Sequence, residues 1–153
     1  MSAAQRTRLY LDVDGVINAQ MPMDWGKLCN GHAGGYSIRW APRMVAELAD
    51  LNVELVWTTT WRDEAVTELA PLIGWGEHGR VLHPAGGELI WPSIDWKFEA
   101  VLADQAASPS SFIWLDDELE AEHKRHGGLV LTVPAALGIT PRIMDMMRDW
   151  IAV

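Results

Sequence analysis

Carboxylates stand in pairs at two places where a short apolar run of the sequence ends. Asp12 and Asp14 lie two positions apart near the start of the chain, and Asp116 and Asp117 are adjacent in its last third. Residues two apart in an extended chain point to the same side, so such carboxylates repel each other unless a proton or a cation lies between them. A hard divalent cation with oxygen ligands, Mg²⁺ above all, removes that repulsion. The four carboxylates are therefore expected around one shared ion, provided that the fold brings them together.

Each acidic pair also has a simpler interpretation. An Asp-x-Asp-Gly pattern is common in surface turns, and Asp116 with Asp117 could cap a helix in solvent. Both pairs lie at the end of a predicted strand, and this shared position favours the chemical interpretation. Gly15, next to Asp14, lets the backbone turn sharply and approach a ligand closely.

Apolar runs alternate with amphipathic segments along the chain, which predicts the fold class. Strands are expected at 7–13, 53–57, 80–83, 112–115 and 129–133. Helices are expected at 42–51, from about Asp63 to just before Pro71, at 95–107, from 118 to about Arg125, and from Thr140 onward. This alternation is typical of an α/β fold, a three-layer sandwich with a mostly parallel, Rossmann-like sheet. The glycine-rich stretch 18–38 has the composition of a loop, with a possible flap over a site.

The carboxyl ends of parallel strands lie at one edge of a sheet, where ligands bind. Three segments far apart in the sequence are therefore expected to meet there. They are the Asp12 segment, the Asp116 segment, and the threonines that follow the strand 53–57. The plainer interpretation of the threonines is β-propensity at a strand end.

The order and spacing of four motifs resemble the haloacid dehalogenase (HAD) superfamily. The motifs are Leu-Asp-Val-Asp-Gly-Val at 11–16, Leu-Val-Trp-Thr-Thr-Thr-Trp at 55–61, Asp-Trp-Lys at 95–97 and Ile-Trp-Leu-Asp-Asp at 113–117. The nearest resemblance is to small, cap-poor, phosphatase-type members, some of which accompany nucleic-acid repair proteins. The resemblance implies a HAD-like phosphoric monoester hydrolase that uses Mg²⁺ and an aspartyl-phosphate intermediate. Dehalogenase members lack the second aspartate of the first motif, so Asp14 favours phosphate chemistry.

The resemblance also assigns roles to residues. Asp12 would attack phosphorus, and Asp14 would act as general acid and then base, its backbone carbonyl helping to hold Mg²⁺. Lys97 would neutralise the charge on Asp12 and on the phosphoryl oxygens, although a lone lysine on a helix is more often exposed. Asp116 would coordinate Mg²⁺, with Asp117 as a second ligand or an orienting partner.

Three further residues complete the predicted substrate site. A hydroxyl after the second strand would bind the phosphoryl group, with Thr59 preferred and Thr58 as the alternative. Arg62 could contact a substrate phosphate, although an exposed ion pair is the more common role for such an arginine. Gly15 would let the backbone approach the substrate.

Size and charge restrict the function further. The 153 residues fit a single domain, 1–153, and the formal net charge of −9 repels polyanions at long range, which argues against avid, non-specific nucleic-acid binding.

Cys29 is the only cysteine, and neither a signal peptide nor a transmembrane run is recognisable, so a cytoplasmic location is expected. His123 and His126 form no metal pattern and are expected at the surface.

The sequence leaves more than one substrate class and more than one function open. About two dozen residues separate the first motif from the next helix, too few for a folded cap domain, so the site is expected to be open. An open site suits a nucleic-acid end as well as a small phosphorylated molecule. The rivals are a non-catalytic phosphate- or metal-binding module on the same fold, a phosphotransferase, and a receiver domain. Receiver domains place the phosphoacceptor and the acidic pair on separate strands, whereas Asp12 and Asp14 share one.

Overall fold

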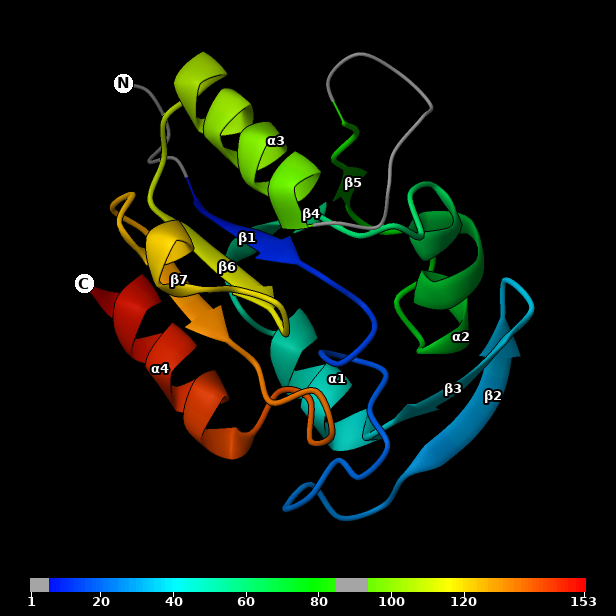
Figure 1. The fold of residues 1–153 in the computed structure, drawn as a ribbon. Coiled ribbons are helices and arrows are strands. Elements are labelled where there is room, and N and C mark those ends of the chain that lie inside the picture. The colour runs from blue at the N-terminus through cyan, green and yellow to red at the C-terminus, as the bar shows by residue number, and fades with distance from the viewer. Residues whose placement is uncertain (1–5, 85–93) are drawn as a thin grey trace.

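Five parallel strands form the central sheet of the computed structural model, which describes residues 6–84 and 94–153. The strands are β1 (Thr7–Leu11), β4 (Val53–Trp57), β5 (Arg80–Val81), β6 (Phe112–Asp116) and β7 (Leu129–Thr132). Their spatial order is β5-β4-β1-β6-β7, with every pairing parallel (Figure 1). The predicted α/β fold with a parallel, Rossmann-like sheet is confirmed.

The strand order also tests the alternative that the chain is a receiver domain. Numbered along the chain within this sheet, the order is 3-2-1-4-5, in which the first strand is central and the chain winds outward in both directions. Receiver domains instead have the order 2-1-3-4-5. The receiver alternative is therefore wrong for this chain.

The central strands are apolar because helices cover both faces of the sheet. Leu9 and Leu11 of β1 point to one face and pack in a core with α1 (Pro42–Ala49) and α4 (Pro141–Ala152). Tyr10 points to the other face and packs in a second core with α3 (Ile94–Ala107), so three layers result (Figure 1). Pro42 and Pro141 open their helices, where a missing N–H is harmless, and Thr140 caps α4 by accepting from the Ile143 N–H at 3.2 Å.

The stretch 18–38 is not the plain loop that its composition suggested. It contains β2 (Cys29–Ala33), which pairs antiparallel with β3 (Tyr36–Trp40) in a hairpin. The two turn residues, Gly34 and Gly35, have φ values of 55° and 83°, and a tight hairpin turn of this kind requires positive φ at both positions. The Gly-Gly pair was thus the overlooked signal. The hairpin extends from the edge of the molecule beside α2 (Ala70–Leu72) (Figure 1).

Two predicted helices also differ from the structure. The one expected to end before Pro71 continues through it, because the π-helical turn η1 (Ala65–Leu69) precedes α2, and the Ala70 N–H bonds five residues back to the carbonyl of Ala65. The helix expected to reach Arg125 is a single 3₁₀ turn, η2 (Ala121–Lys124), held by reciprocal bonds between Glu120 and His123. His123 is buried there, not at the surface. Ser93, which the sequence offers beside Asp95 as a cap for the helix expected at 95–107, lies outside the described residues. Within the described part of the chain, no helix is both long and apolar enough to cross a bilayer.

Candidate active site

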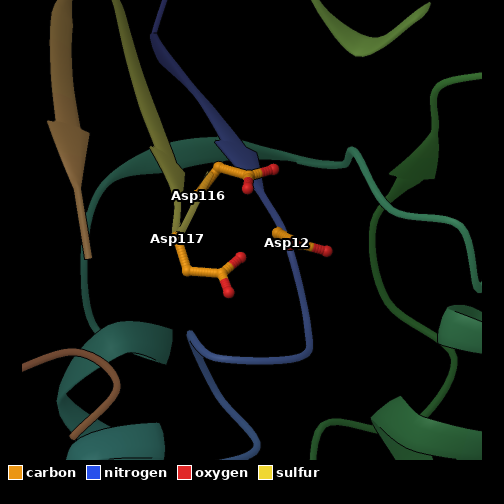
Figure 2. A group of neighbouring side chains, drawn as sticks. All are labelled: Asp12, Asp116 and Asp117. Atoms are coloured by element: carbon orange, nitrogen blue, oxygen red, sulfur yellow. The ribbon is translucent and has the colours of Figure 1, made fainter. Parts of the chain in front are cut away.

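Three carboxylates meet where β1 and β6 end. Asp12 follows β1, Asp116 ends β6, and Asp117 begins the loop after it (Figure 2). The two strands are neighbours, with Leu11 opposite Leu115, so the residues that follow them must lie side by side. One carboxylate oxygen of each aspartate lies within 4.8 Å of the others. The structure thus brings three of the four predicted carboxylates to one point.

Lys97 lies among these carboxylates and is buried. Its Nζ is 2.8 Å from Oδ2 of Asp116 and 3.2 Å from Oδ2 of Asp12. The side chain comes from the first turn of α3, which brings it over the carboxyl end of the sheet. The alternative of an exposed helix lysine is therefore wrong. An ammonium in contact with two buried carboxylates can neutralise part of their charge.

The site carries more negative charge than Lys97 can balance. Burial and the charge of Asp116 raise the pKa of Asp12 to about 7, although Lys97 opposes this. Burial and the same neighbour raise the pKa of Asp117 to about 6. Burial lowers the pKa of Lys97, but Asp12 and Asp116 outweigh it, so this pKa lies above its ordinary value. Carboxylates this close, with oxygen donors only, match the ligand set of a hard divalent cation.

Asp14 lies outside this cluster and is exposed. Its Oδ2 accepts a hydrogen bond from Nε1 of Trp61 at 2.9 Å, and its Oδ1 accepts one from Nδ2 of Asn18 at 3.0 Å. The expectation that all four carboxylates crowd together is wrong for this side chain, because two N–H donors hold it beside the cluster. Coordination of Mg²⁺ through the backbone carbonyl of Asp14 stays a prediction. Sequence reasoning missed both donors: Trp61 was noted only as part of a motif, and Asn18 carries no signal of its own.

Thr58 and Thr59 follow β4 beside the end of β1, and both are fully buried. The Thr58 hydroxyl donates to the Val56 carbonyl at 3.2 Å, so its hydrogen is already used. The Thr59 oxygen accepts from the Trp61 N–H at 3.2 Å, an arrangement that leaves its own hydrogen for another acceptor. The hydrogen-bonding pattern supports Thr59 over Thr58 as the phosphoryl-binding hydroxyl.

Gly15 and Arg62 occupy turns beside the site. Gly15 has a φ of 77°, and a Cβ there would lie 2.6 Å from Oδ2 of Asp117. Only glycine therefore lets the first loop pass so close to the acidic cluster. Arg62 is half-buried and has a φ of 53°, and its N–H bonds to the Thr59 carbonyl at 3.2 Å. Its predicted contact with a phosphate stays a prediction.

The raised pKa values lead to a prediction about stability. Folded Asp12 has a pKa of about 7 against an ordinary 3.8, so the folded protein binds more protons than the unfolded chain between these limits. The free energy of unfolding in EDTA should therefore fall as the pH rises from about 4 to about 7. Mg²⁺ would bind the ionised form of these carboxylates, so it should stabilise the fold more at pH 8 than at pH 5. Urea denaturation at both pH values, with EDTA or Mg²⁺, measures this.

The control for that measurement is Asp12→Asn, which removes the main titrating group and should flatten the pH dependence in EDTA. Equal stabilisation by Mg²⁺ at pH 5 and pH 8 would contradict binding at these carboxylates.

The sequence of one protein family matches most of this chain. The model of the family described as "HAD domain in Swiss Army Knife RNA repair proteins" matches residues 8–142, a span that includes every residue of the site. No curated protein and no solved structure gives a significant match.

Proposed function

Because the chain belongs to the family of HAD domains in Swiss Army Knife RNA repair proteins, we propose that it is a Mg²⁺-dependent phosphomonoesterase that works through an aspartyl phosphate. Membership of this family suggests a phosphohydrolase-type function. The observation that carries the finer proposal is the contact of Lys97 with Asp12 and Asp116 beside Asp117. A buried carboxylate that could serve as the nucleophile, an ammonium that can neutralise it, and carboxylates suited to a hard cation lie together.

The first step would transfer the phosphoryl group to Asp12. One carboxylate oxygen of Asp12 forms a bond to phosphorus while the bond from phosphorus to the leaving oxygen breaks, and Asp14 gives its proton to that oxygen. The Val13 N–H, 2.8 Å from Oδ1, holds the Asp12 carboxylate in position, while Oδ2 faces Lys97. Lys97 and the Thr59 hydroxyl would stabilise charge on the phosphoryl oxygens.

The second step would release inorganic phosphate. Asp14, now ionised, takes a proton from water, whose oxygen attacks phosphorus and breaks the bond to Asp12. The pair of N–H donors from Trp61 and Asn18 orients the Asp14 carboxylate in this role. The carboxylates of Asp12, Asp116 and Asp117, with the carbonyl of Asp14, are the groups that would hold Mg²⁺. When bound, the ion would offset the excess negative charge and polarise the phosphoryl group.

A terminal phosphate of RNA is the substrate we would test first. The family description names RNA repair proteins, and a groove of about 1080 Å³ opens beside Asp14 and Asp117 without a cap domain over it among the described residues. A small phosphorylated molecule is the other substrate class. The net charge of −9 favours recognition of one end over binding along a polymer.

The test of this function combines metal dependence with leaving-group dependence. Wild-type protein should release phosphate from an aryl phosphate in Mg²⁺ but not in EDTA. Asp14→Asn should lower kcat/KM by roughly 10²- to 10⁴-fold for an alkyl phosphate, and by less for a nitrophenyl phosphate, because a good leaving group needs no proton. Asp149→Asn, the same change on the exposed face of α4, is the matched control.

Turnover that EDTA leaves intact would overturn the proposal. Mg²⁺ binding without turnover on any phosphomonoester would favour the non-catalytic module. Phosphate release that requires an added alcohol acceptor would favour the phosphotransferase.

A further inference from the structure

The groove beside the acidic cluster continues along the hairpin, and its two ends differ in charge. Its lining includes Asp14, Asn30, His32, Ser37, Arg39 and Asp117. The carboxylates among these residues, Asp14 and Asp117, lie at the catalytic end. The hairpin end contributes amide, hydroxyl and imidazole groups and the guanidinium of Arg39. A ligand that spans the groove would thus reach a cation beyond the reacting phosphate.

Neutral groups, not carboxylates, hold the Arg39 side chain. Its Nε donates to Oδ1 of Asn30 at 3.0 Å, and its Nη1 donates to the carbonyl of Gln20 at 2.7 Å. These bonds use two of the five N–H donors of a guanidinium, so three remain without a bond to the described residues. No carboxylate among residues 6–84 and 94–153 forms an ion pair with Arg39, although the side chain is exposed.

Several other arginines of the chain, unlike Arg39, form ion pairs with carboxylates of the described residues. Arg8 and Arg80 each contact both Glu54 and Asp104, Arg43 contacts Glu47, and Arg148 contacts Glu47 and Asp145. In a chain with 21 acidic and 12 basic residues, an arginine that is fixed in position without a carboxylate keeps its charge for a ligand.

Asn18 connects Arg39 directly to the catalytic end. Its Oδ1 accepts a hydrogen bond from the Arg39 backbone N–H at 2.9 Å, while its Nδ2 donates to Oδ1 of Asp14 at 3.0 Å. One side chain therefore fixes the distance between the proton donor of the reaction and the strand that carries Arg39. Because Asp14 would protonate the leaving oxygen, the leaving group would lie on the Asp14 side and extend into this groove.

We propose that Arg39 binds a second phosphate of the substrate, one carried by the leaving group beyond the phosphate that Asp12 attacks. This inference rests on the proposed phosphomonoesterase function. A guanidinium presents a planar set of donors that matches phosphate oxygens. The described residues that line the hairpin end of the groove include no carboxylate that would repel an anion. The second phosphate could belong to the next nucleotide of an RNA strand or to a nucleoside bisphosphate. Sugar monophosphates and mononucleotides lack it.

The test compares substrates with one and with two phosphates. Arg39→Gln should lower kcat/KM about 10- to 100-fold for a nucleoside 3′,5′-bisphosphate and for a phosphorylated ribo-oligonucleotide, the range expected for charge-assisted hydrogen bonds. It should leave turnover of an aryl phosphate and of mononucleotides unchanged. Arg142→Gln, the same loss of charge on the exposed face of α4, should affect none of them. Arg39→Lys, which keeps the charge but not the planar fork, should give an intermediate loss.

The substrate pattern separates the sources of the phosphate. A loss confined to the oligonucleotide assigns Arg39 to a strand, a loss confined to the bisphosphate assigns it to a small molecule, and a loss on both assigns it to the phosphate that they share. An unchanged ratio between two-phosphate and one-phosphate substrates would overturn the inference. So would an equal loss on the aryl phosphate, which would indicate damage to the catalytic centre.

A binding measurement keeps this test separate from the proposed activity. Fluorescence anisotropy of a labelled, phosphorylated ribo-oligonucleotide requires no turnover. Arg39→Gln should weaken binding. The plot of log K against log salt should become shallower, with the magnitude of its negative slope reduced by about 0.7, the contribution of one phosphate contact in a single strand. Aryl phosphatase activity in the wild type tests the phosphomonoesterase function alone. Wild-type affinity and salt slope retained in Arg39→Gln would refute the subsite, whether or not the protein is an enzyme.

Discussion

Replacement of Asp12 by asparagine is expected to abolish Mg²⁺-dependent phosphate release while the protein stays folded. The amide has the same shape as the carboxylate but cannot form an acyl phosphate, so kcat should fall by roughly 10⁴-fold or more, as for loss of other covalent nucleophiles. Asp12 is 6% exposed, and burial together with Asp116 disfavours its charge. Without metal at pH 8, the free energy of unfolding should therefore be equal to that of the wild type or higher.

Acid-quenched samples make the prediction specific to the nucleophile. Mass spectrometry should find a phosphorylated peptide that contains Asp12 in the wild type and in Asp149→Asn, but not in Asp12→Asn. Wild-type turnover in Asp12→Asn would assign the nucleophile to another group. A lower stability of the variant in EDTA at pH 8 would contradict the assignment of excess negative charge to this site.

Replacement of Lys97 by methionine is expected to cause the largest loss of stability. Methionine fills a similar volume, but the carboxylates that the ammonium contacts at 2.8 and 3.2 Å are left without a buried counter-charge. Loss of one partner from a buried ion pair costs about 3 to 5 kcal/mol in the free energy of unfolding. The loss should be greatest at pH 8 in EDTA. It should shrink at pH 5, where Asp12 takes up a proton, and when Mg²⁺ is present.

Urea denaturation under these three conditions measures the effect, with Lys124→Met, an exposed lysine of η2, as the matched control. The double variant Lys97→Met with Asp12→Asn should recover part of the lost stability, because both charges are then absent. An equal loss at pH 5 and pH 8 would mean that Lys97 stabilises the fold by packing alone. Phosphatase activity should be lost in Lys97→Met even in saturating Mg²⁺, since the phosphoryl charge is no longer balanced.

The local pattern of the sequence determined most of the sheet and the place of the acidic residues. The strand predicted at 53–57 has the bounds of β4, because a continuous apolar run is needed where helices cover both faces. The carboxyl ends of parallel strands share one edge, so Asp12 and Asp116 had to meet once their strands were neighbours. The hairpin at 29–40 could have been predicted from its Gly-Gly turn, whereas passage of a helix through Pro71 depends on a π-helical turn that has no local signal.

The tertiary structure alone decided which groups surround each proposed catalytic side chain. Whether Lys97 is exposed or buried depends on how α3 lies over the sheet, and the Lys97 contact with Asp116 spans 19 residues. The partner of Asp14, Trp61, is 47 residues away, and Arg39 reaches Asn18 across 21. The spacing of residues along a strand or helix is repeated locally and can be read from the sequence. Contacts between elements depend on packing of the whole chain, which no local pattern contains.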